Sequence, residues 1–463
     1  MVSLHMRFWI LSLLPLVLAL NAMGLALRDS PVVPQADPFY EPPQGWKDKP
    51  LGHIFRSREV KVKAIFNLDV AKAYQILYRT SYTNKSEPTT SAATILVPHN
   101  HKKDTLVAYG DWQDANGPTC APSYALQTGI YGDDPSVVLN FALMLPFLQA
   151  GYPVVVADKE GRKNAFASGF VEGHQTLDSI RAAVKFDKMN FTDNVRVVGS
   201  GYSGGAIQIG WAAALMPVYA PEIPVVGWYY GGTPTNLDAL AKKINKSIYS
   251  GFLISGITGI ADTYPEIKKF INEVGTSELL NGMQYAREHC LAENNQHFIF
   301  ADIKTKKYTS LGDKIFESGP IQKIFNKLEM GRDPKLTPNV PVLMQHGVSD
   351  EIADYDAAIN SYLHWCQQGA NIEMTEFVNP IAAHALTAIT GVPSSFLWLK
   401  DRLDGKKVDF QGCRTKSTET ILFDVNDLGE DFKDILGIIK GLAGDKVGPN
   451  DDKFKKIIAN GNH

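Results

Sequence analysis

A serine flanked by glycines stands where an apolar segment of the sequence gives way to a helix-like one. The run Val195–Val198 is apolar and β-branched except for Arg196, Gly201-Tyr202-Ser203-Gly204-Gly205 comes shortly after it, and Ala206–Leu215 is apolar and helix-like. Strand, sharp turn and helix around Gly-x-Ser-x-Gly form a nucleophile elbow, which exposes the serine hydroxyl at the end of the strand. The flanking glycines remove side chains that would collide there. We therefore predict that Ser203 is a nucleophile; the alternative is an ordinary glycine-rich turn.

A serine hydroxyl needs a base to take its proton and an acid to hold that base. In proteins with this elbow, the acid and then the histidine follow the serine, each on a loop after a later strand. Asp350 follows the apolar run Val340–Gln345, and His384 follows Asn371–Phe377. We predict these two residues as the acid and the base.

Other residues compete for both roles. The competing acids are Glu351, Asp354 and Asp356, and the competing histidines are His346 and His364. We expect Asp354 and Asp356 to lie in the next helix and to point elsewhere. The rival histidines fall at the end of a strand and in a helix. For His384 the alternative is a buried histidine held by hydrogen bonds in the core.

Ester chemistry also needs hydrogen-bond donors for a developing oxyanion. The N–H of Gly204, directly after the nucleophile, is the first expected donor. The second should come from the loop 110–117, after a short apolar strand. Any backbone amide of that loop qualifies, and so do the side chains of Gln113 and Asn116.

Several segments before residue 232 have the patterns of strands and helices. Those of the antiparallel type are Val60–Phe66, Ala73–Thr80 and Ala92–Val97. Further strands are expected at Thr105–Tyr109, Pro153–Ala157, Val195–Val198 and Pro224–Tyr230, and helices at Val138–Gln149 and Thr176–Met189. This alternation predicts an α/β fold with a mostly parallel sheet between helical layers.

The alternation stops near Gly232 and resumes with the strands around the helix Ala353–Gln367. The intervening segment reads as mostly helical and is too long for a loop. We predict a first part of the core at 27–232, a helical cap or lid at 233–338, a second part at 339–415 and a tail at 416–463 with an amphipathic helix. Within the cap, Ile248–Ile260 is either a packed helix or a mobile lid that exposes apolar surface to lipid.

The first 26 residues have the pattern of a secretory signal peptide, with Arg7 before the apolar run Phe8–Leu20 and small residues up to Ala26. A membrane anchor is the alternative, but the run is short for a span. Export makes two disulfides the expected state of Cys120, Cys290, Cys366 and Cys413. Glycans are expected at the sequons of Asn84, Asn190 and Asn245, although Asn190 lies close to the elbow strand.

Composition excludes some classes of function. The chain has 463 residues, 44% of them hydrophobic, and a formal net charge of -3. Without a basic surplus, nucleic acid is not an expected partner. There is no Cys-x-x-Cys pair, so no metal site is expected, and no cofactor is implied.

Six motifs follow one another in an order that resembles a known family. They are Asp114 six residues before Cys120-Ala121-Pro122-Ser123-Tyr124, Asp158-Lys159-Glu160-Gly161, Gly201-Tyr202-Ser203-Gly204-Gly205, Tyr230-Gly231-Gly232-Thr233-Pro234, Ser349-Asp350-Glu351-Ile352 and Ile381-Ala382-Ala383-His384. Over roughly residues 35–415 the chain is similar to the secreted fungal lipases typified by Candida antarctica lipase A. The polar loop 112–117 and the tail from residue 431 depart from the family pattern.

The resemblance implies an α/β-hydrolase core with a helical cap, triacylglycerol substrates and a triad of Ser203, Asp350 and His384. It implies the disulfide pairs Cys120–Cys290 and Cys366–Cys413. It also implies an aspartate in the oxyanion hole, for which Asp114 is the matching residue and Asp111 the second choice. A carboxylate cannot donate a hydrogen bond, so this aspartate must be protonated, and burial would favour that form.

These observations together predict a secreted, extracellular serine lipase, expected to be a monomer without a stable membrane anchor, whose partners are an ester substrate and the lipid–water interface. A carboxylesterase or acyltransferase acting on soluble esters with the same triad is the alternative among enzymes. A non-catalytic binding module is the alternative from another class.

Overall fold

The computed structural model describes residues 31–64, 70–129, 132–134, 136–378 and 383–418. The predicted signal peptide and the amphipathic part of the tail lie outside these residues. Within them, no helix combines the length and the apolar character that crossing a membrane requires.

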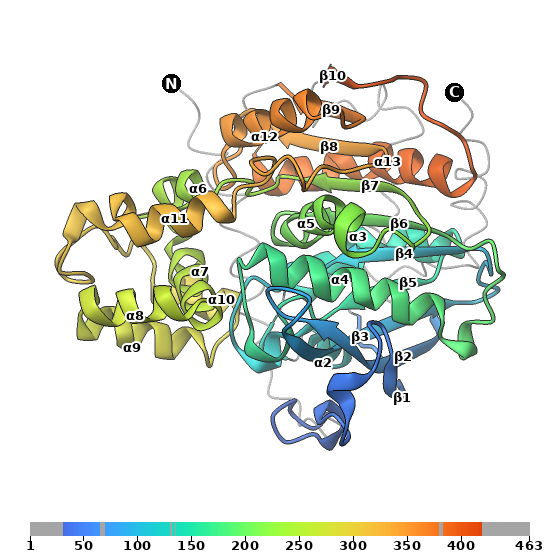
Figure 1. The fold of residues 1–463 in the computed structure, drawn as a ribbon, viewed down its shortest axis with the longest axis horizontal. Coiled ribbons are helices and arrows are strands. Elements are labelled where there is room, and N and C mark those ends of the chain that lie inside the picture. Colours follow the sequence, from blue (N-terminus) through green and yellow to red (C-terminus); the bar gives the residue numbers. More distant parts are fainter. Residues whose placement is uncertain (1–30, 65–69, 130–131, 135, 379–382, 419–463) are drawn as a thin grey trace, which may run out of the picture.

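A ten-stranded sheet forms the centre of the molecule, with the order β1-β2-β3-β5-β4-β6-β7-β8-β9-β10 (Figure 1). The strands β1 to β3 and β5 pair antiparallel, and the pairs from β5 through β4 to β10 are parallel. The bounds are β1 Ile54–Val60, β2 Val70–Ser81, β3 Pro88–Pro98, β4 Thr105–Gly110, β5 Val154–Ala157, β6 Arg196–Tyr202, β7 Val225–Gly231, β8 Val342–Gly347, β9 Ile372–Phe377 and β10 Cys413–Thr418.

The central strands are covered on both faces, which explains their continuous apolar runs. Every residue of β4, β5 and β8 is buried. The helices α4 (Gly169–Val184), α5 (Gly204–Tyr219) and α12 (Tyr355–Gln367) pack on one face, and α2 (Pro122–Thr128), α3 (Val137–Gln149) and α13 (His384–Leu403) pack on the other.

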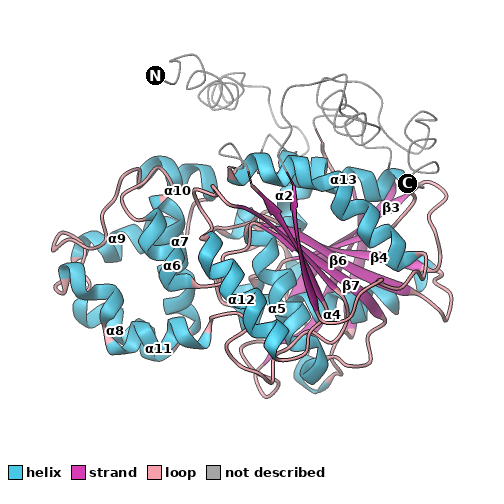
Figure 2. Ribbon diagram, turned by 90° about the horizontal axis from the view of Figure 1, so that it is seen from above, coloured by secondary structure: helices cyan, strands magenta, loops and turns pink. Residues whose placement is uncertain are grey.

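The chain between β7 and β8 forms a helical body beside one end of the sheet (Figure 2). Its helices are α6 (Leu237–Ile244), α7 (Ser250–Thr263), α8 (Pro265–Val274), α9 (Ser277–Ala286), α10 (Leu291–His297) and α11 (Gly319–Lys327). The central helix α7 packs against α8, α9 and α10. A Cβ on Gly259 would lie 2.3 Å from the backbone oxygen of Phe166, so α7 also fits closely against the core. This packing favours the interior helix over the mobile lid.

The structure corrects the sequence interpretation at both edges of the sheet. The strand predicted at Val60–Phe66 is wrong: β1 ends at Val60, residues 61–64 form no strand, and residues 65–66 are not described. The strand β10 was not expected, and it extends past the predicted end of the core at residue 415. Both are edge strands with no buried residue and largely polar sequences, so they lack the apolar runs that mark inner strands. The helix α13 was also not expected.

Candidate active site

Ser203 lies at the sharp turn between β6 and α5. Its φ of 53° and ψ of -124° are unfavourable for a residue with a side chain. The turn is tight because the backbones approach closely: a Cβ on Gly201 would lie 2.5 Å from the oxygen of Gly205, and one on Gly205 would lie 2.1 Å from that of Gly110. Glycine is therefore required at both positions, and the Ser203 hydroxyl is held beyond the end of the sheet.

The loops after β6, β8 and β9 bring the three predicted residues together. His384 Nε2 lies 2.7 Å from Ser203 Oγ, and His384 Nδ1 lies 2.7 Å from Asp350 Oδ2. The other oxygen of Asp350 accepts hydrogen bonds from the N–H groups of Ile352 and Ala353 at 2.9 and 2.8 Å. All three side chains of the triad are at least nine-tenths buried. This geometry suits proton transfer from the serine to the imidazole.

The charges of the pair support the same arrangement. Burial alone would lower the pKa of His384, but the carboxylate of Asp350 outweighs it and the pKa is raised. Burial would raise the pKa of Asp350, but His384 outweighs it and the pKa is lowered. The pair therefore favours an ionised acid and an imidazole that readily accepts a proton.

The competing residues hold other positions. Asp354 caps the N-terminus of α12 through the N–H of Ala357, and Asp356 and His364 lie within that helix. His346 is buried in β8, with Nε2 3.3 Å from the oxygen of Ala353 and 3.5 Å from Asp350 Oδ2.

Glu351 has a position that sequence reasoning missed. Its Oε2 accepts the backbone N–H of His384 at 2.8 Å, and its Oε1 accepts the hydroxyl of Tyr249, next to α7, at 3.2 Å. The carbonyl of His384 in turn accepts the hydroxyl of Tyr202 at 2.9 Å. The backbone of the histidine is thus fixed at both its N–H and its carbonyl. In the sequence, Glu351 stands out only as a competing candidate for the acid of the triad.

Asp114 lies directly against the first residue of α5. A Cβ on Gly204 would lie 1.5 Å from Asp114 Oδ1, so the carboxyl group fits against the glycine that follows the nucleophile. Burial raises the pKa of Asp114, and Lys159, whose Nζ is 3.5 Å from Oδ1, offsets this only in part. The side chains of Gln113 and Asn116 donate instead to Glu160 and to the carbonyl of Asn164, at 3.1 and 2.9 Å.

Buried carboxyl groups surround this loop. They belong to Asp111, Asp114, Asp134, Asp158, Glu160 and Glu172. Among the described residues, the ion pairs that these groups form all involve Lys159, which sequence reasoning gave no role. Burial raises the pKa of Asp134 and of Asp158 to about 7, and that of Asp111 well above its ordinary value. The described residues contain no cluster suited to a metal ion.

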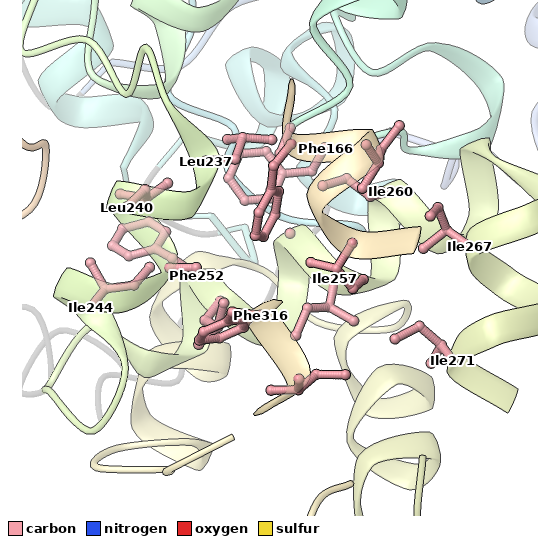
Figure 3. A pocket seen from close by; sticks show the side chains of 18 of the residues that line it. Phe166, Leu237, Leu240, Ile244, Phe252, Ile257, Ile260, Ile267, Ile271 and Phe316 are labelled. Carbon is pink, nitrogen blue, oxygen red and sulfur yellow. The ribbon is translucent and has the colours of Figure 1, made fainter. Parts of the chain in front are cut away.

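An apolar cavity of about 60 Å³ lies between the cap and α5. Figure 3 shows side chains from α6, α7 and α8, together with Phe166 and Phe316, pointing into it. Ile207 also lines it, and its N–H lies 3.3 Å from the carbonyl of Ser203, in the same first turn of α5. The cavity is therefore lined in part by the helix turn that begins at the serine.

Two disulfides join the elements around the site, with the pairs Cys120–Cys290 and Cys366–Cys413. The first links the loop after β4 to the cap, and the second links α12 to β10. Of the sequon asparagines, Asn84 and Asn190 are exposed. Asn245 is half-buried: its Nδ2 donates to Asp302 at 2.8 Å and its Oδ1 accepts the N–H of Ile303 at 2.8 Å.

The sheet with its helical layers and the elbow serine paired with a histidine define a protein of the α/β-hydrolase class. The secretory lipase family matches residues 134–410. The chain is 45% identical over 98% of its length to all of the secreted triacylglycerol lipase LIP3 of Malassezia globosa, and 46% identical over 95% to LIP2 of that species, of which 97% is covered. The chain belongs to the secretory lipase family.

Solved structures agree on the fold. The closed state of Candida antarctica lipase A matches with a TM-score of 0.79 at 27% identity, over 89% of this chain and 96% of that one. The rice cell wall degrading esterase LipA of Xanthomonas oryzae, at 17% identity, matches with a TM-score of 0.59 over 78% of this chain and 100% of that one. This second likeness concerns the fold.

Proposed function

We propose that the chain is an exported serine lipase that hydrolyses the ester bonds of triacylglycerols and releases free fatty acids. The observation that carries the proposal is a buried serine in hydrogen-bond contact with a histidine, at the start of a helix whose first turn lines an apolar cavity. The names of the full-length relatives support both the substrate and the export. No metal or cofactor is needed for this chemistry.

The first half of the reaction forms an acyl-enzyme. His384 Nε2 takes the proton of Ser203 Oγ while the oxygen attacks the ester carbonyl carbon. Asp350 accepts the hydrogen bond of Nδ1–H, which holds the imidazole in place and stabilises its cation. The imidazolium then donates its proton to the leaving alcohol oxygen, and the ester bond of the substrate breaks. Water, activated by the same histidine, hydrolyses the acyl-serine in the second half.

The tetrahedral oxyanion needs two donors beside the serine. The N–H of Gly204 is the first, because the opening residues of a helix have N–H groups that the helix itself does not use. A protonated Asp114 carboxyl is the second, since it lies against Gly204 and its Oδ1 has only the contact with Lys159 at 3.5 Å. Its raised pKa favours the form that can donate.

The decisive experiment compares Ser203→Ala with the wild type on emulsified triolein and on dissolved p-nitrophenyl butyrate. We expect the variant to keep its melting temperature and to lose both activities. Residual turnover by the variant would rule out Ser203 as the nucleophile. Wild-type turnover confined to the dissolved ester would instead indicate a carboxylesterase or acyltransferase, and failure to bind a serine-directed phosphonate would indicate a binding module.

A further inference from the structure

Three large apolar side chains of the cap are exposed close to one another, and we name Ile248, Ile299 and Phe300 the cap patch. Their exposed fractions are 48%, 50% and 60%. Ile248 belongs to the loop between α6 and α7, and the other two follow α10. The two segments lie side by side, since the N–H of Phe300 donates to the carbonyl of Ser247 at 2.9 Å.

The fold holds this patch in place by polar contacts beneath it. The N–H of Lys246 donates to the carbonyl of Ala301 at 2.9 Å, and both ends of the Asn245 amide bond to Asp302 and Ile303. The next residues on either side point inward, because Phe298 and Ala301 are buried. The exposure of Ile299 and Phe300 is therefore a property of a fixed turn.

Stability gives no reason for the residue types of this turn. Phe300 has a φ of 60°, in the left-handed region that asparagine and glycine adopt most readily and bulky residues rarely do. Its ring is also the most exposed of the large apolar side chains in the described chain. A bulky residue kept in an unfavourable conformation and in water points to a function outside the fold.

The patch is connected to the site. Ile244 and Phe252, on either side of Ile248 in the chain, both line the apolar cavity (Figure 3). Between them, Tyr249 stacks on Phe252 with a centroid distance of 6.2 Å, and its hydroxyl bonds to Glu351. A partner surface that binds the patch would therefore bind the loop that joins two side chains of the cavity wall, Ile244 and Phe252.

The positive charges beside the patch suit a lipid surface that contains fatty acid carboxylates. Lys246 and Lys304 are exposed and form no ion pair among the described residues. Lipolysis leaves fatty acid carboxylates at the surface of the oil, and exposed lysines near such a surface attract it. Apolar side chains flanked by lysines are the composition of interfacial anchors.

We propose that Ile248, Ile299 and Phe300 insert into the surface of aggregated triacylglycerol, with Lys246 and Lys304 at its carboxylates, and so place the cavity wall at the oil. This proposal rests on the proposed lipase function, which supplies triacylglycerol as the substrate. It concerns adsorption, which is measured separately from hydrolysis.

The test is Phe300→Asn, because asparagine suits a φ of 60° and leaves the turn intact. Adsorption is measured on the inactive Ser203→Ala background, by depletion of protein from water after flotation of a triolein emulsion. We expect the partition coefficient to fall about tenfold. With Ser203 present, we expect unchanged turnover of dissolved p-nitrophenyl butyrate, a lower rate on triolein and a melting temperature that is unchanged or higher.

The matched control is Leu363→Asn, which removes a side chain of 45% exposure from α12. We expect wild-type adsorption and lipolysis from it. Equal adsorption by Phe300→Asn and the wild type, or equal losses in Phe300→Asn and Leu363→Asn, would overturn the proposal. If the Ser203→Ala protein adsorbs through the patch while the wild type fails to hydrolyse triolein, the proposed function falls and the surface stands.

The lysines have their own measurement on vesicles of neutral phosphatidylcholine with and without oleate. We expect the wild type to bind the oleate-containing vesicles more tightly and Lys246→Gln with Lys304→Gln to lose that preference, by about fivefold for each lysine. A preference that the double variant retains would overturn the assigned role of the two lysines.

Discussion

The carboxylate of Glu351 accepts the backbone N–H of His384, so the residue next to the acid of the triad also holds the base. Its second oxygen is bonded to Tyr249, next to the cap helix α7. The cap and the catalytic histidine are therefore joined through one side chain. A shift of the loop before α7 would therefore change the position of Glu351 and, through it, that of His384.

Replacing Glu351 tests this connection. In Glu351→Ala the first N–H of α13 loses its acceptor, and loss of such a cap costs about 1 kcal/mol. We expect kcat on a dissolved ester to fall roughly fivefold to tenfold as His384 loses its fixed position. Glu351→Gln keeps an acceptor and should restore most of kcat, yet it removes a charge that contributes to the raised pKa of His384. The acid limb of its pH–rate profile should move to lower pH; an unmoved limb would contradict the electrostatic part of this role.

The protonated Asp114 predicts a loss of activity at high pH. Activity should rise as pH increases through the raised pKa of His384, since the base must be neutral, and should fall as pH passes the raised pKa of Asp114. Asp114→Asn keeps a donor that does not titrate. Profiles of kcat/KM should therefore lose the alkaline limb in this variant, and a limb identical to that of the wild type would exclude Asp114 as the donor.

Asp158 makes the stability of the fold depend on pH. Its carboxyl bonds to Ser123 at 2.7 and 2.6 Å, and burial raises its pKa to about 7, against about 3.9 in an unfolded chain. Between these values the folded state keeps a proton that the unfolded state has lost. The contribution of Asp158 to the free energy of unfolding should therefore fall by up to about 4 kcal/mol as pH rises from 4 to 7. Urea unfolding of Asp158→Asn, which still bonds to Ser123, should show a smaller fall; an equal fall would place its origin elsewhere.

The two disulfides should differ in what their removal does to the reaction. Each closes a long loop, with separations of 170 and 47 residues, and we expect each double alanine variant to lose about 2–5 kcal/mol of stability. Cys120 belongs to the loop that carries Asp114, whereas Cys413 starts an edge strand. Only the Cys120→Ala, Cys290→Ala protein should also lose kcat, by about tenfold; equal kcat in the two variants would contradict this difference.

Gly256 tests which part of the cavity an acyl chain occupies. A Cβ there would meet only the side chain of Ala167, at 3.9 Å, so Gly256→Leu can extend into the cavity without displacing backbone. We expect kcat/KM on p-nitrophenyl palmitate to fall at least tenfold, with that on the butyrate changed less than twofold. A uniform fall for all chain lengths would mean that the acyl chain lies elsewhere.

The catalytic residues could be predicted from the sequence because the nucleophile, the acid and the base follow one another in a fixed order along the chain. Ser203, Asp350 and His384 could be selected because each follows a predicted strand in the required chain order, and the structure brings them together. Glu351 could not be assigned its contacts, because they join it to residues 33 and 102 positions away and one of them is a backbone N–H. The apolar cavity was equally out of reach, since several helices line it and each side chain alone resembles an ordinary core residue.

The buried carboxyl groups around Lys159 make the protein respond to the fatty acid that it releases. Each turnover of an ester adds an acid to the surroundings. Falling pH slows the reaction by protonating His384, but it supplies the protons that Asp134 and Asp158 hold in the folded state. Lipolysis without buffering should thus slow itself as acid accumulates, while these two carboxyl groups keep the protons that the folded state favours.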